Sequence, residues 1–486
     1  MTSVIEQIYH HAKQAPERLA VIFDEAVVSY GELWDKIVRC AHLYQTLGVR
    51  KGDRVICQCK YDPIFAACIY AAHLCGAAYV TADKDANDAM LNTLAEQLDA
   101  KLVVCNPKGD RPLHGIFFDE LTDRLPEDTS MEGLAFPEPD SVATILFTTG
   151  TTGAPKGVQI TQRGATARIL ARINEFNASN GSVCIAMVSL NHAAPVTMLD
   201  MYLYCGGTMI FLDGMMRIGR MFEYLDKYGV TTIYFPPSGI SLLKQFSKEK
   251  LAKYTDQLDY VSTGSASMSV SQQDYMRRML PHTRLYTCYG SSEAGVVTLY
   301  RYDNSERDIT CCGKPCSGVD LRVMDDEGQA LPVGQIGVIA IKSDMTMKGY
   351  YKHPELNDAV LRDGYFISSD LGYLDEEGYL YVCGRKDDMI NIGGLKVYPS
   401  EIENVALKIP GIVDCICFGV PDPITGRAVK LLIQTDGKAS LSVASVQDAL
   451  SHVLDYYKVP KSIEFVTEIA KTANGKPDRK HYQQGN

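Results

Sequence analysis

A loop rich in glycine and threonine follows an apolar run in ILFTTGTTGAPKGVQI, residues 145–160, and the loop ends at Lys156. Glycine lets the backbone curl closely around an anion, so that several amide groups point at it. Threonine hydroxyls add donors, and a lysine ammonium is a point charge suited to phosphate. The segment therefore predicts a phosphate-binding loop. It is not a P-loop of the GxxxxGKS/T type, because that spacing from Gly150 requires glycine where the chain has Pro155.

Four later segments carry further residues that could take part in binding or chemistry. YGSSE, residues 289–293, combines an aromatic ring, hydroxyls and a carboxylate, and its spacing is not the GxSxG of a serine nucleophile. SSDLGYLDEEGYLYVCGRKDD contains Asp370 and Arg385, and a carboxylate can accept from both hydroxyls of a cis-diol. NIGGLKVYPSEIE and KTANGKPDRK follow near the C-terminus. Taken singly, a turn aspartate or a lysine in a basic tail would be an ordinary solvated charge.

Taken in order, these five segments resemble the motifs of the adenylate-forming superfamily, which includes acyl-CoA synthetases, peptide-synthetase adenylation domains and luciferase. The resemblance covers nearly the whole chain, from APERLAVIFDEAVVSYGEL onward. It implies an α/β fold with a large N-terminal domain, residues 1–386, of α/β subdomains plus a small β-barrel-like subdomain. A small mobile α+β C-terminal domain, residues 387–486, would follow. The implied cofactors are ATP and Mg²⁺.

The resemblance also assigns roles to residues. It implies that Lys476, Glu293 and His192 are catalytic and that Glu293 binds the metal. The ATP or AMP would be bound by Thr148, Thr149, Gly150, Thr151, Thr152, Gly153, Lys156, Ser265, Tyr289, Gly290, Ser291, Ser292, Asp370 and Arg385. Asp387 would be the hinge and Gly394 would line the thiol channel. The acyl pocket would be lined by Ala194, Met198, Gly264, Ala266, Gly290, Val296 and Val297.

Three positions depart from the family pattern. Ser292 replaces the usual threonine and keeps its hydroxyl. Ser369 replaces the glycine that precedes the ribose-binding aspartate, and Pro477 replaces an aliphatic residue after the catalytic lysine. The hydroxyl that contacts phosphate is therefore kept, whereas the backbone beside the aspartate loses a glycine.

The implied reaction has two steps. A carboxylate is a poor acyl donor, so it first attacks the α-phosphate of ATP to give acyl-AMP and pyrophosphate. Both reactants are anionic, and preorganised cations, namely Lys156, Lys476 and Mg²⁺ bound by Glu293, would lower the barrier. A thiol then displaces AMP. The second step needs Lys476 to leave the site and a thiol channel to open, which a rotation about Asp387 would allow.

The stretch SLNHAAPVTMLDMYLYCGGT bears on the acid. His192 lies where aryl and fatty acyl-CoA synthetases often carry histidine, although it could also be a gate or a packed core residue. The aspartate with which peptide-synthetase domains hold an α-ammonium is absent, which argues against an α-amino acid. The small, uncharged pocket residues favour an apolar aryl or medium-chain acid. Asp200 is interpreted as a hydrogen-bonded structural carboxylate rather than a substrate contact.

CoA is favoured as the thiol, because the chain has no carrier segment. The alternative is a stand-alone adenylation enzyme that loads the phosphopantetheine of a carrier protein, and luciferase-like oxygenation is a third reading. A serine hydrolase could be argued from SLLK, residues 241–244, but no partner motif follows. A nucleotide-binding protein without catalysis would lack Lys476 or Glu293, and both are present.

Composition narrows the remaining possibilities. The 486 residues are 46% apolar and 22% charged, as in soluble globular proteins, and they require more than one core. A net charge of −11 without a basic, aromatic run argues against nucleic acid as a partner. Fifteen cysteines without zinc-site spacing, after a start that lacks a signal-peptide pattern, indicate a reducing cytoplasm and no metal cage. We expect a monomer or homodimer.

Residue patterns predict the types of element. Helical stretches such as IGRMFEYLDKYG alternate with β-branched runs and indicate largely parallel sheets; the runs are residues 101–105, 141–149, 208–212 and 230–235. From about residue 313, strand–turn–strand patterns indicate antiparallel pairing. Residues 63–80 carry no formal charge, but they contain His73 and lead directly into TADKD. They predict a buried helix and strand rather than a membrane span.

Overall fold

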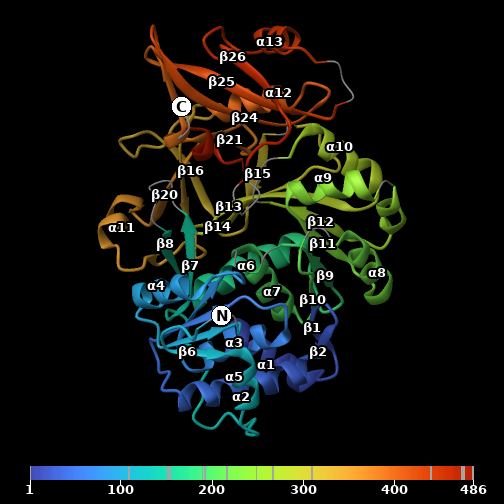
Figure 1. The fold of residues 1–486 in the computed structure, drawn as a ribbon, viewed down its shortest axis with the longest axis vertical. Coiled ribbons are helices and arrows are strands. Elements are labelled where there is room, and N and C mark those ends of the chain that lie inside the picture. Colours follow the sequence, from blue (N-terminus) through green and yellow to red (C-terminus); the bar gives the residue numbers. More distant parts are fainter. Residues whose placement is uncertain are drawn as a thin grey trace.

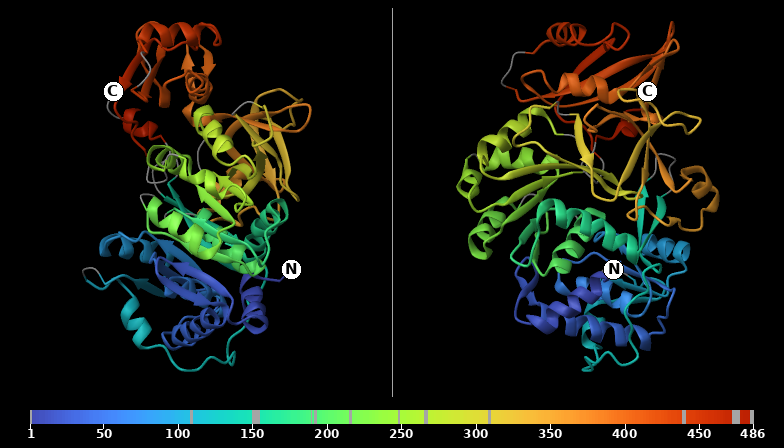
Figure 2. Two further views of the ribbon diagram at one scale, coloured as in Figure 1. Left: turned by 90° about the vertical axis from the view of Figure 1, so that its right-hand side faces the viewer. Right: turned by 180° about the vertical axis from the view of Figure 1, so that it is seen from behind.

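The computed structural model describes residues 2–107, 110–149, 155–188, 190, 193–214, 217–247, 249–264, 268–307, 310–437, 441–471 and 477–483, without the side chains of residues 148, 149, 155 and 480. Two large sheets and their helices make up most of the molecule (Figure 1). The C-terminal segment, coloured orange to red, lies at one end, and the N-terminal helices lie at the other (Figure 2).

Seven strands form the first sheet, in the order β18-β8-β7-β4-β3-β5-β6. The strands from β7 to β6 are parallel, whereas β8 and β18 are antiparallel to their neighbours. The side chains of β3 and β5 are almost all buried, as expected of parallel strands covered on both faces. The bounds are β3 (Arg54–Gln58), β4 (Ala78–Ala82), β5 (Leu102–Cys105), β6 (Gly115–Phe117), β7 (Val142–Thr149), β8 (Pro155–Thr161) and β18 (Gly349–Tyr350).

The second sheet has the order β16-β17-β20-β21-β15-β14-β13-β12-β11-β9-β10-β1-β2, with β19 beside β20. It is parallel from β13 to β1 and antiparallel elsewhere. The bounds are β1 (Leu19–Phe23), β2 (Ala26–Ser29), β9 (Val183–Ala186), β10 (Thr208–Phe211), β11 (Thr232–Phe235), β12 (Tyr260–Thr263), β13 (Arg284–Ser291), β14 (Gly295–Arg301), β15 (Cys311–Pro315), β16 (Asp320–Met324), β17 (Gly337–Lys342), β19 (Leu361–Arg362), β20 (Tyr365–Leu374) and β21 (Leu380–Arg385). The predicted change from parallel to antiparallel pairing is confirmed.

Helices pack on both sheets, and the largest apolar cluster contains residues of α2, α3, α6 and α7. Every residue of α3 is buried, and β4 follows it, which confirms the buried helix and strand predicted for residues 63–80. In the described part of the chain, no helix is both long and apolar enough to cross a bilayer. The bounds are α1 (Val4–Gln14), α2 (Tyr30–Thr46), α3 (Pro63–Leu74), α4 (Asp88–Leu98), α5 (Phe118–Asp123), α6 (Gln162–Phe176), α7 (Ala193–Cys205), α8 (Ile218–Tyr228), α9 (Pro237–Phe246), η1 (Lys250–Tyr254), α10 (Val270–Met279) and α11 (Pro354–Val360).

The C-terminal segment has its own three-stranded sheet, β24-β25-β26, and its own apolar cluster. Helices α12 and α13 contribute to this cluster, and the short pair β22–β23 precedes it in the chain. Its α+β character agrees with the sequence prediction. The bounds are η2 (Lys386–Asp388), β22 (Ile390–Ile392), β23 (Leu395–Val397), α12 (Pro399–Ala406), β24 (Ile412–Asp422), β25 (Gly426–Thr435), α13 (Val443–Ser451), β26 (Ser462–Val466) and α14 (Arg479–Gln483).

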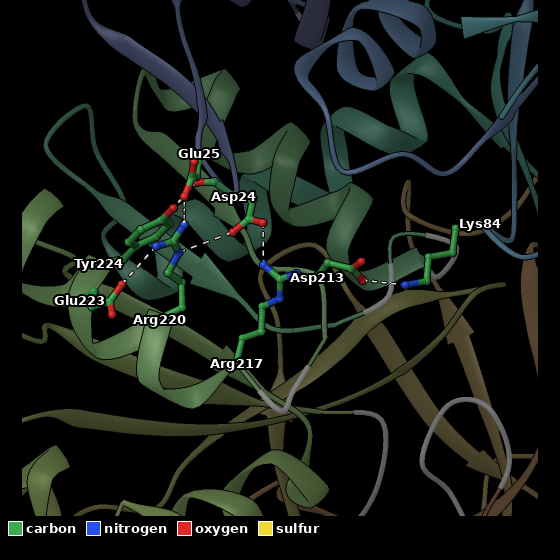
Figure 3. A network of polar contacts seen from close by, with 8 residues as sticks. All are labelled: Asp24, Glu25, Lys84, Asp213, Arg217, Arg220, Glu223 and Tyr224. Carbon is green, nitrogen blue, oxygen red and sulfur yellow. Dashed lines mark hydrogen bonds and ion pairs between the residues drawn. The ribbon is translucent and has the colours of Figure 1, made fainter. Parts of the chain in front are cut away.

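Charged side chains fix the loops at one edge of the second sheet (Figure 3). Arg217 Nη1 lies 2.5 Å from Asp24 Oδ2 in the β1–β2 turn, and Arg220 on α8 contacts the same carboxylate. Lys84 Nζ, after β4, lies 2.8 Å from Asp213 Oδ1, after β10, and this pair links the two sheets. The network is completed by Glu25, Glu223 and Tyr224. Because these pairs are partly exposed, each contributes about 0–1 kcal/mol and mainly sets loop position.

Candidate active site

Strands β20 and β21 place Asp370 directly opposite Arg385. Arg385 Nε lies 3.7 Å from Asp370 Oδ1. The guanidinium also donates two hydrogen bonds to the Ser369 hydroxyl, with an Nη2–Oγ distance of 2.6 Å and an Nε–Oγ distance of 3.2 Å. The serine that replaces the family glycine therefore holds the guanidinium beside the carboxylate. Sequence analysis identified Ser369 as a departure but missed this contact.

Tyr289, near the end of β13, joins this pair from a third strand. Its hydroxyl donates a hydrogen bond of 2.8 Å to Asp370 Oδ2. Burial first, and the Asp370 charge second, raise the pKa of Tyr289 well above its usual value, so the hydroxyl stays protonated. At the adjacent Gly290, a Cβ would lie 2.0 Å from the Gly295 carbonyl oxygen, so only glycine fits. The first residue of YGSSE is thus bonded to the Asp370–Arg385 pair.

Glu293, the last residue of YGSSE, contacts a different part of the chain. The Tyr350 hydroxyl donates a hydrogen bond of 3.0 Å to Glu293 Oε1. Strand β18 pairs with β8, so that Tyr350 lies opposite Val158, and Lys156 Nζ lies 5.4 Å from the centre of the Tyr350 ring. The lysine of the predicted phosphate loop and the predicted metal ligand therefore contact one tyrosine, which sequence analysis did not identify.

A buried arginine supports the backbone behind YGSSE. Arg168, on α6, donates hydrogen bonds of 2.8 Å to the Ser292 carbonyl and 2.9 Å to the Met345 carbonyl. Only 5% of its surface is exposed, and burial lowers its pKa to about 10, so it remains charged at neutral pH. The Ser291 hydroxyl accepts from the Ala294 amide at 3.2 Å, which closes the turn. Nothing in the sequence separates Arg168 from the other arginines of α6.

Several predicted site residues lie outside the described part of the chain. Strands β7 and β8 pair as far as Thr149 and Pro155, so the two ends of the phosphate loop are neighbours. The residues not described, wholly or in their side chains, are Thr148, Thr149, Gly150, Thr151, Thr152, Gly153, His192, Ser265, Ala266 and Lys476. Their roles stay predictions.

The chain on either side of residues 472–476, which include Lys476, is anchored. Lys471 and Pro477 form an isolated antiparallel bridge. Arg479 Nη2 lies 2.5 Å from Glu403 Oε2, and Arg479 Nη1 lies 3.7 Å from Asp388 Oδ2. Asp388 directly follows the predicted hinge residue Asp387 in η2. Gly394, in the turn between β22 and β23, has a φ of +94°, which favours glycine.

The predicted acyl-pocket residues belong, as far as the structure describes them, to separate apolar clusters. Ala194 and Met198 on α7 are part of the largest cluster. Val296 and Val297, adjacent on β14, belong to two others, and Gly264 follows β12. That these residues share a pocket stays a prediction.

A cavity of about 20 Å³ lies against α7, which is enough for one water molecule. The Tyr70 hydroxyl donates a hydrogen bond of 2.7 Å to Asp200 Oδ1, and burial raises the pKa of Asp200 to about 7. The prediction that Asp200 is hydrogen-bonded is confirmed. The cavity is lined by Tyr79, Thr144, Leu146, Ile160, Ala165, Arg168, Ala193, Val196, Thr197 and Asp200.

The SLLK segment is an ordinary part of α9. The Ser241 hydroxyl accepts a hydrogen bond of 2.8 Å from Gln272, and Lys244 Nζ donates one of 2.5 Å to Ser271. Serine and lysine therefore bond to α10 instead of to each other. This arrangement does not support a serine nucleophile.

Comparison with known proteins bears on the family. Residues 8–351 match the model of the AMP-binding enzymes, and residues 401–476 match that of the AMP-binding enzyme C-terminal domain. The chain belongs to the AMP-binding enzymes. These are the adenylate-forming superfamily that the motifs resemble, with a large N-terminal and a small C-terminal domain.

Individual relatives are similar over most of this AMP-binding enzyme. Feruloyl-CoA synthase of Amycolatopsis sp is 27% identical over 474 residues, which are 96% of this chain and 95% of the relative. A long-chain-fatty-acid–CoA ligase of Escherichia coli O6:H1 is 30% identical over 352 residues, 70% of this chain and 60% of the relative. The crystal structure of ATP-bound MatB from Rhodopseudomonas palustris superposes with a TM-score of 0.89 at 25% identity and covers 100% of this chain and 99% of MatB.

The described residues fit a magnesium nucleotide. Asp370 and Arg385 offer an acceptor and donors on the paired strands β20 and β21, and Lys156 offers a cation against Tyr350, which is hydrogen-bonded to Glu293. The Glu293 carboxylate supplies the oxygen ligands that Mg²⁺ prefers.

Proposed function

We propose that this AMP-binding enzyme activates a carboxylic acid with ATP and transfers the acyl group to CoA, as an AMP-forming acyl- or aryl-CoA synthetase. One observation carries the proposal: YGSSE is bonded at Tyr289 to the Asp370–Arg385 pair and at Glu293 to the side chain that also contacts Lys156. This arrangement provides separate places for a ribose and for phosphates. A non-catalytic nucleotide-binding protein has no need of the metal ligand or of Lys476.

In the first step, the carboxylate oxygen of the acid attacks the α-phosphorus of ATP, and pyrophosphate leaves. Asp370 accepts hydrogen bonds from the ribose hydroxyls, with Arg385 beside it. Lys156, with the Gly–Thr loop, holds the phosphate oxygens, and Lys476 stabilises the charge that develops between acid and phosphate. Glu293 would hold Mg²⁺, which supplies charge neutralisation on the phosphates.

In the second step, the thiolate of CoA attacks the acyl carbonyl and AMP leaves. We propose that the C-terminal domain, residues 387–486, turns about Asp387 relative to residues 1–386. The turn withdraws Lys476 and brings Gly394 to the thiol channel. The turn between β22 and β23 that holds Gly394 follows η2 closely, so a rotation at η2 would move it directly.

The acid is proposed to be an apolar aryl or medium-chain acid, bound near His192, Ala194 and Met198. The name of the feruloyl-CoA synthase relative supports an aryl acid and a CoA acceptor, whereas the fatty-acid ligase leaves an alkyl chain open. Loading of a carrier protein is the alternative. We further propose a cytoplasmic monomer or homodimer; the fifteen free thiols support the compartment.

The test is incubation with Mg-ATP, CoA and a panel of aryl, short, medium and long carboxylic acids, with products identified by mass spectrometry. A new acyl-CoA with AMP and pyrophosphate is the expected result and fixes the substrate class. Acyl-AMP without thioester would indicate that a carrier protein, rather than CoA, is the acyl acceptor. No AMP with any acid, from protein that binds no Mg-ATP, would contradict the proposal.

A further inference from the structure

One tyrosine, Tyr350, contacts both charged ends of the predicted phosphate and metal site. Antiparallel pairing of β18 with β8 places it opposite Val158, two residues from Lys156. Residues two apart on a strand point to the same face, so Lys156 and Tyr350 are diagonal neighbours across the pair. The distance of 5.4 Å from Lys156 Nζ to the ring centre is that of a cation–π contact.

The same side chain reaches Glu293 with its other end. Its hydroxyl donates a hydrogen bond of 3.0 Å to Glu293 Oε1. The Met347 amide donates a second hydrogen bond, of 2.7 Å, to the backbone carbonyl oxygen of Glu293. Only 7% of Tyr350 is exposed, because its ring packs in an apolar cluster while its hydroxyl reaches the carboxylate.

Lys156 and Glu293 carry opposite charges, and within the described ranges the contacts found for these two charged groups are both with Tyr350 rather than with each other. The ring of Tyr350 contacts the ammonium and its hydroxyl contacts the carboxylate, so each charge has a neutral partner. A direct pair would satisfy the two charges with each other and leave less of either for a ligand. The tyrosine contacts replace that pair.

We infer that Tyr350 is a positioning residue that holds Glu293 for a divalent cation and keeps it apart from Lys156. The inference rests on the proposed function, since it assumes that Glu293 binds the metal that accompanies ATP. A hydrogen bond to a ligating carboxylate fixes its orientation, and losing such a bond typically costs 10–100-fold in metal affinity.

The test compares Tyr350→Phe with Tyr351→Phe. Each variant removes one tyrosine hydroxyl and keeps the ring. The Tyr351 hydroxyl donates a hydrogen bond of 3.1 Å to the Leu98 carbonyl oxygen, away from Glu293. ATP binding is measured by calorimetry at a series of Mg²⁺ concentrations and without Mg²⁺. We expect Tyr350→Phe to raise the Mg²⁺ concentration needed for half-maximal binding about tenfold and to leave Mg²⁺-free binding within about twofold.

Tyr351→Phe should keep the wild-type Mg²⁺ midpoint, and thermal unfolding should show that all three proteins are folded. An unchanged midpoint in Tyr350→Phe, or an equal shift in both variants, would overturn the inference while the proposed function stands. ATP binding by the wild-type protein that does not depend on the Mg²⁺ concentration would instead contradict the role of Glu293 as a metal ligand. Tyr350→Leu, which also removes the ring, should shift the midpoint further.

Discussion

Two aspartates in this molecule accept the same kind of bond, from a tyrosine hydroxyl, in different surroundings. Asp370 accepts from Tyr289 at 2.8 Å, lies 3.7 Å from Arg385 and keeps 24% of its side chain exposed. Asp200 accepts from Tyr70 at 2.7 Å inside the largest core, with 9% of its surface exposed. Burial raises the pKa of Asp200 to about 7.

The difference separates a binding carboxylate from a structural one. A carboxylate beside a cation and partly open to solvent can accept hydrogen bonds from a ligand. A carboxylate in an apolar core that forms no ion pair with the described residues, as at Asp200, is half-protonated near neutral pH and serves mainly to pair other buried polar groups. A perturbed pKa often indicates a functional site, but the raised pKa of Asp200 reflects its burial in the core.

The largest expected effect is on nucleotide binding. Asp370→Ala removes the proposed acceptor for the ribose hydroxyls and the hydrogen-bond partner of Tyr289. We expect kcat/KM for ATP to fall about 100-fold, which corresponds to about 3 kcal/mol for two lost charged hydrogen bonds. The rate of pyrophosphate release at a series of ATP concentrations measures this fall in kcat/KM. In the same assay, kcat/KM for ATP of Asp200→Asn should remain within about threefold of the wild-type value. Equal losses in both variants would contradict the distinction between a binding carboxylate at Asp370 and a structural one at Asp200.

The core aspartate should control stability through pH. The pKa of Asp200 in the folded protein, about 7, lies above the ordinary value of 3.8, so the folded state binds the proton more tightly than the unfolded state. Its contribution is fully present below pH 3.8 and is lost as pH rises to about 7, at roughly 1.4 kcal/mol per pH unit. Urea unfolding between pH 5 and 8 should show this slope for wild type relative to Asp200→Asn. Parallel pH profiles would mean that Asp200 has an ordinary pKa.

A smaller loss of stability should follow Tyr70→Phe. The substitution keeps the ring but removes the donor from a buried carboxylate, which costs about 1–3 kcal/mol. It should also raise the pKa of Asp200 further, because the bond to Tyr70 lowers that pKa. Chemical denaturation at pH 6 and pH 8 measures both effects. The kcat/KM for ATP should stay near wild type; a loss like that of Asp370→Ala would place Asp200 in the site.

The elements and the order of the site segments could be predicted because both depend on local patterns. Apolar β-branched runs gave strands β5, β7, β10 and β11, since strand formation needs only a side-chain pattern that fits a covered sheet. The pairing of Asp370 with Arg385 could be expected from their places in a strand–turn–strand segment.

The partners from distant parts of the chain could not be predicted. Tyr350 and Glu293 are 57 residues apart, and Arg168 and Ser292 are 124 apart, so their contacts depend on how two sheets pack. No periodicity in the sequence encodes such a register between sheets. The predicted acyl pocket has the same difficulty, because the residues predicted to line it lie on α7, after β12 and on β14, and the depth of a pocket depends on their separation in space.

The smallest expected effect tests whether the Ser369 hydroxyl positions Arg385 in the proposed nucleotide site. The Ser369 hydroxyl accepts from Arg385 at 2.6 and 3.2 Å, so Ser369→Ala frees the guanidinium without adding backbone freedom. Because a partly exposed hydrogen bond to a charged group contributes on the order of 1 kcal/mol, we expect KM for ATP to rise about threefold to tenfold with kcat almost unchanged. Ser369→Thr keeps the hydroxyl and should restore most of the loss. A rise in KM that threonine fails to reverse would mean that the side-chain volume, rather than the bond to Arg385, determines nucleotide affinity. The unfolding midpoint should not move in either variant, since the bond lies at the exposed end of β21 and orders only the arginine side chain.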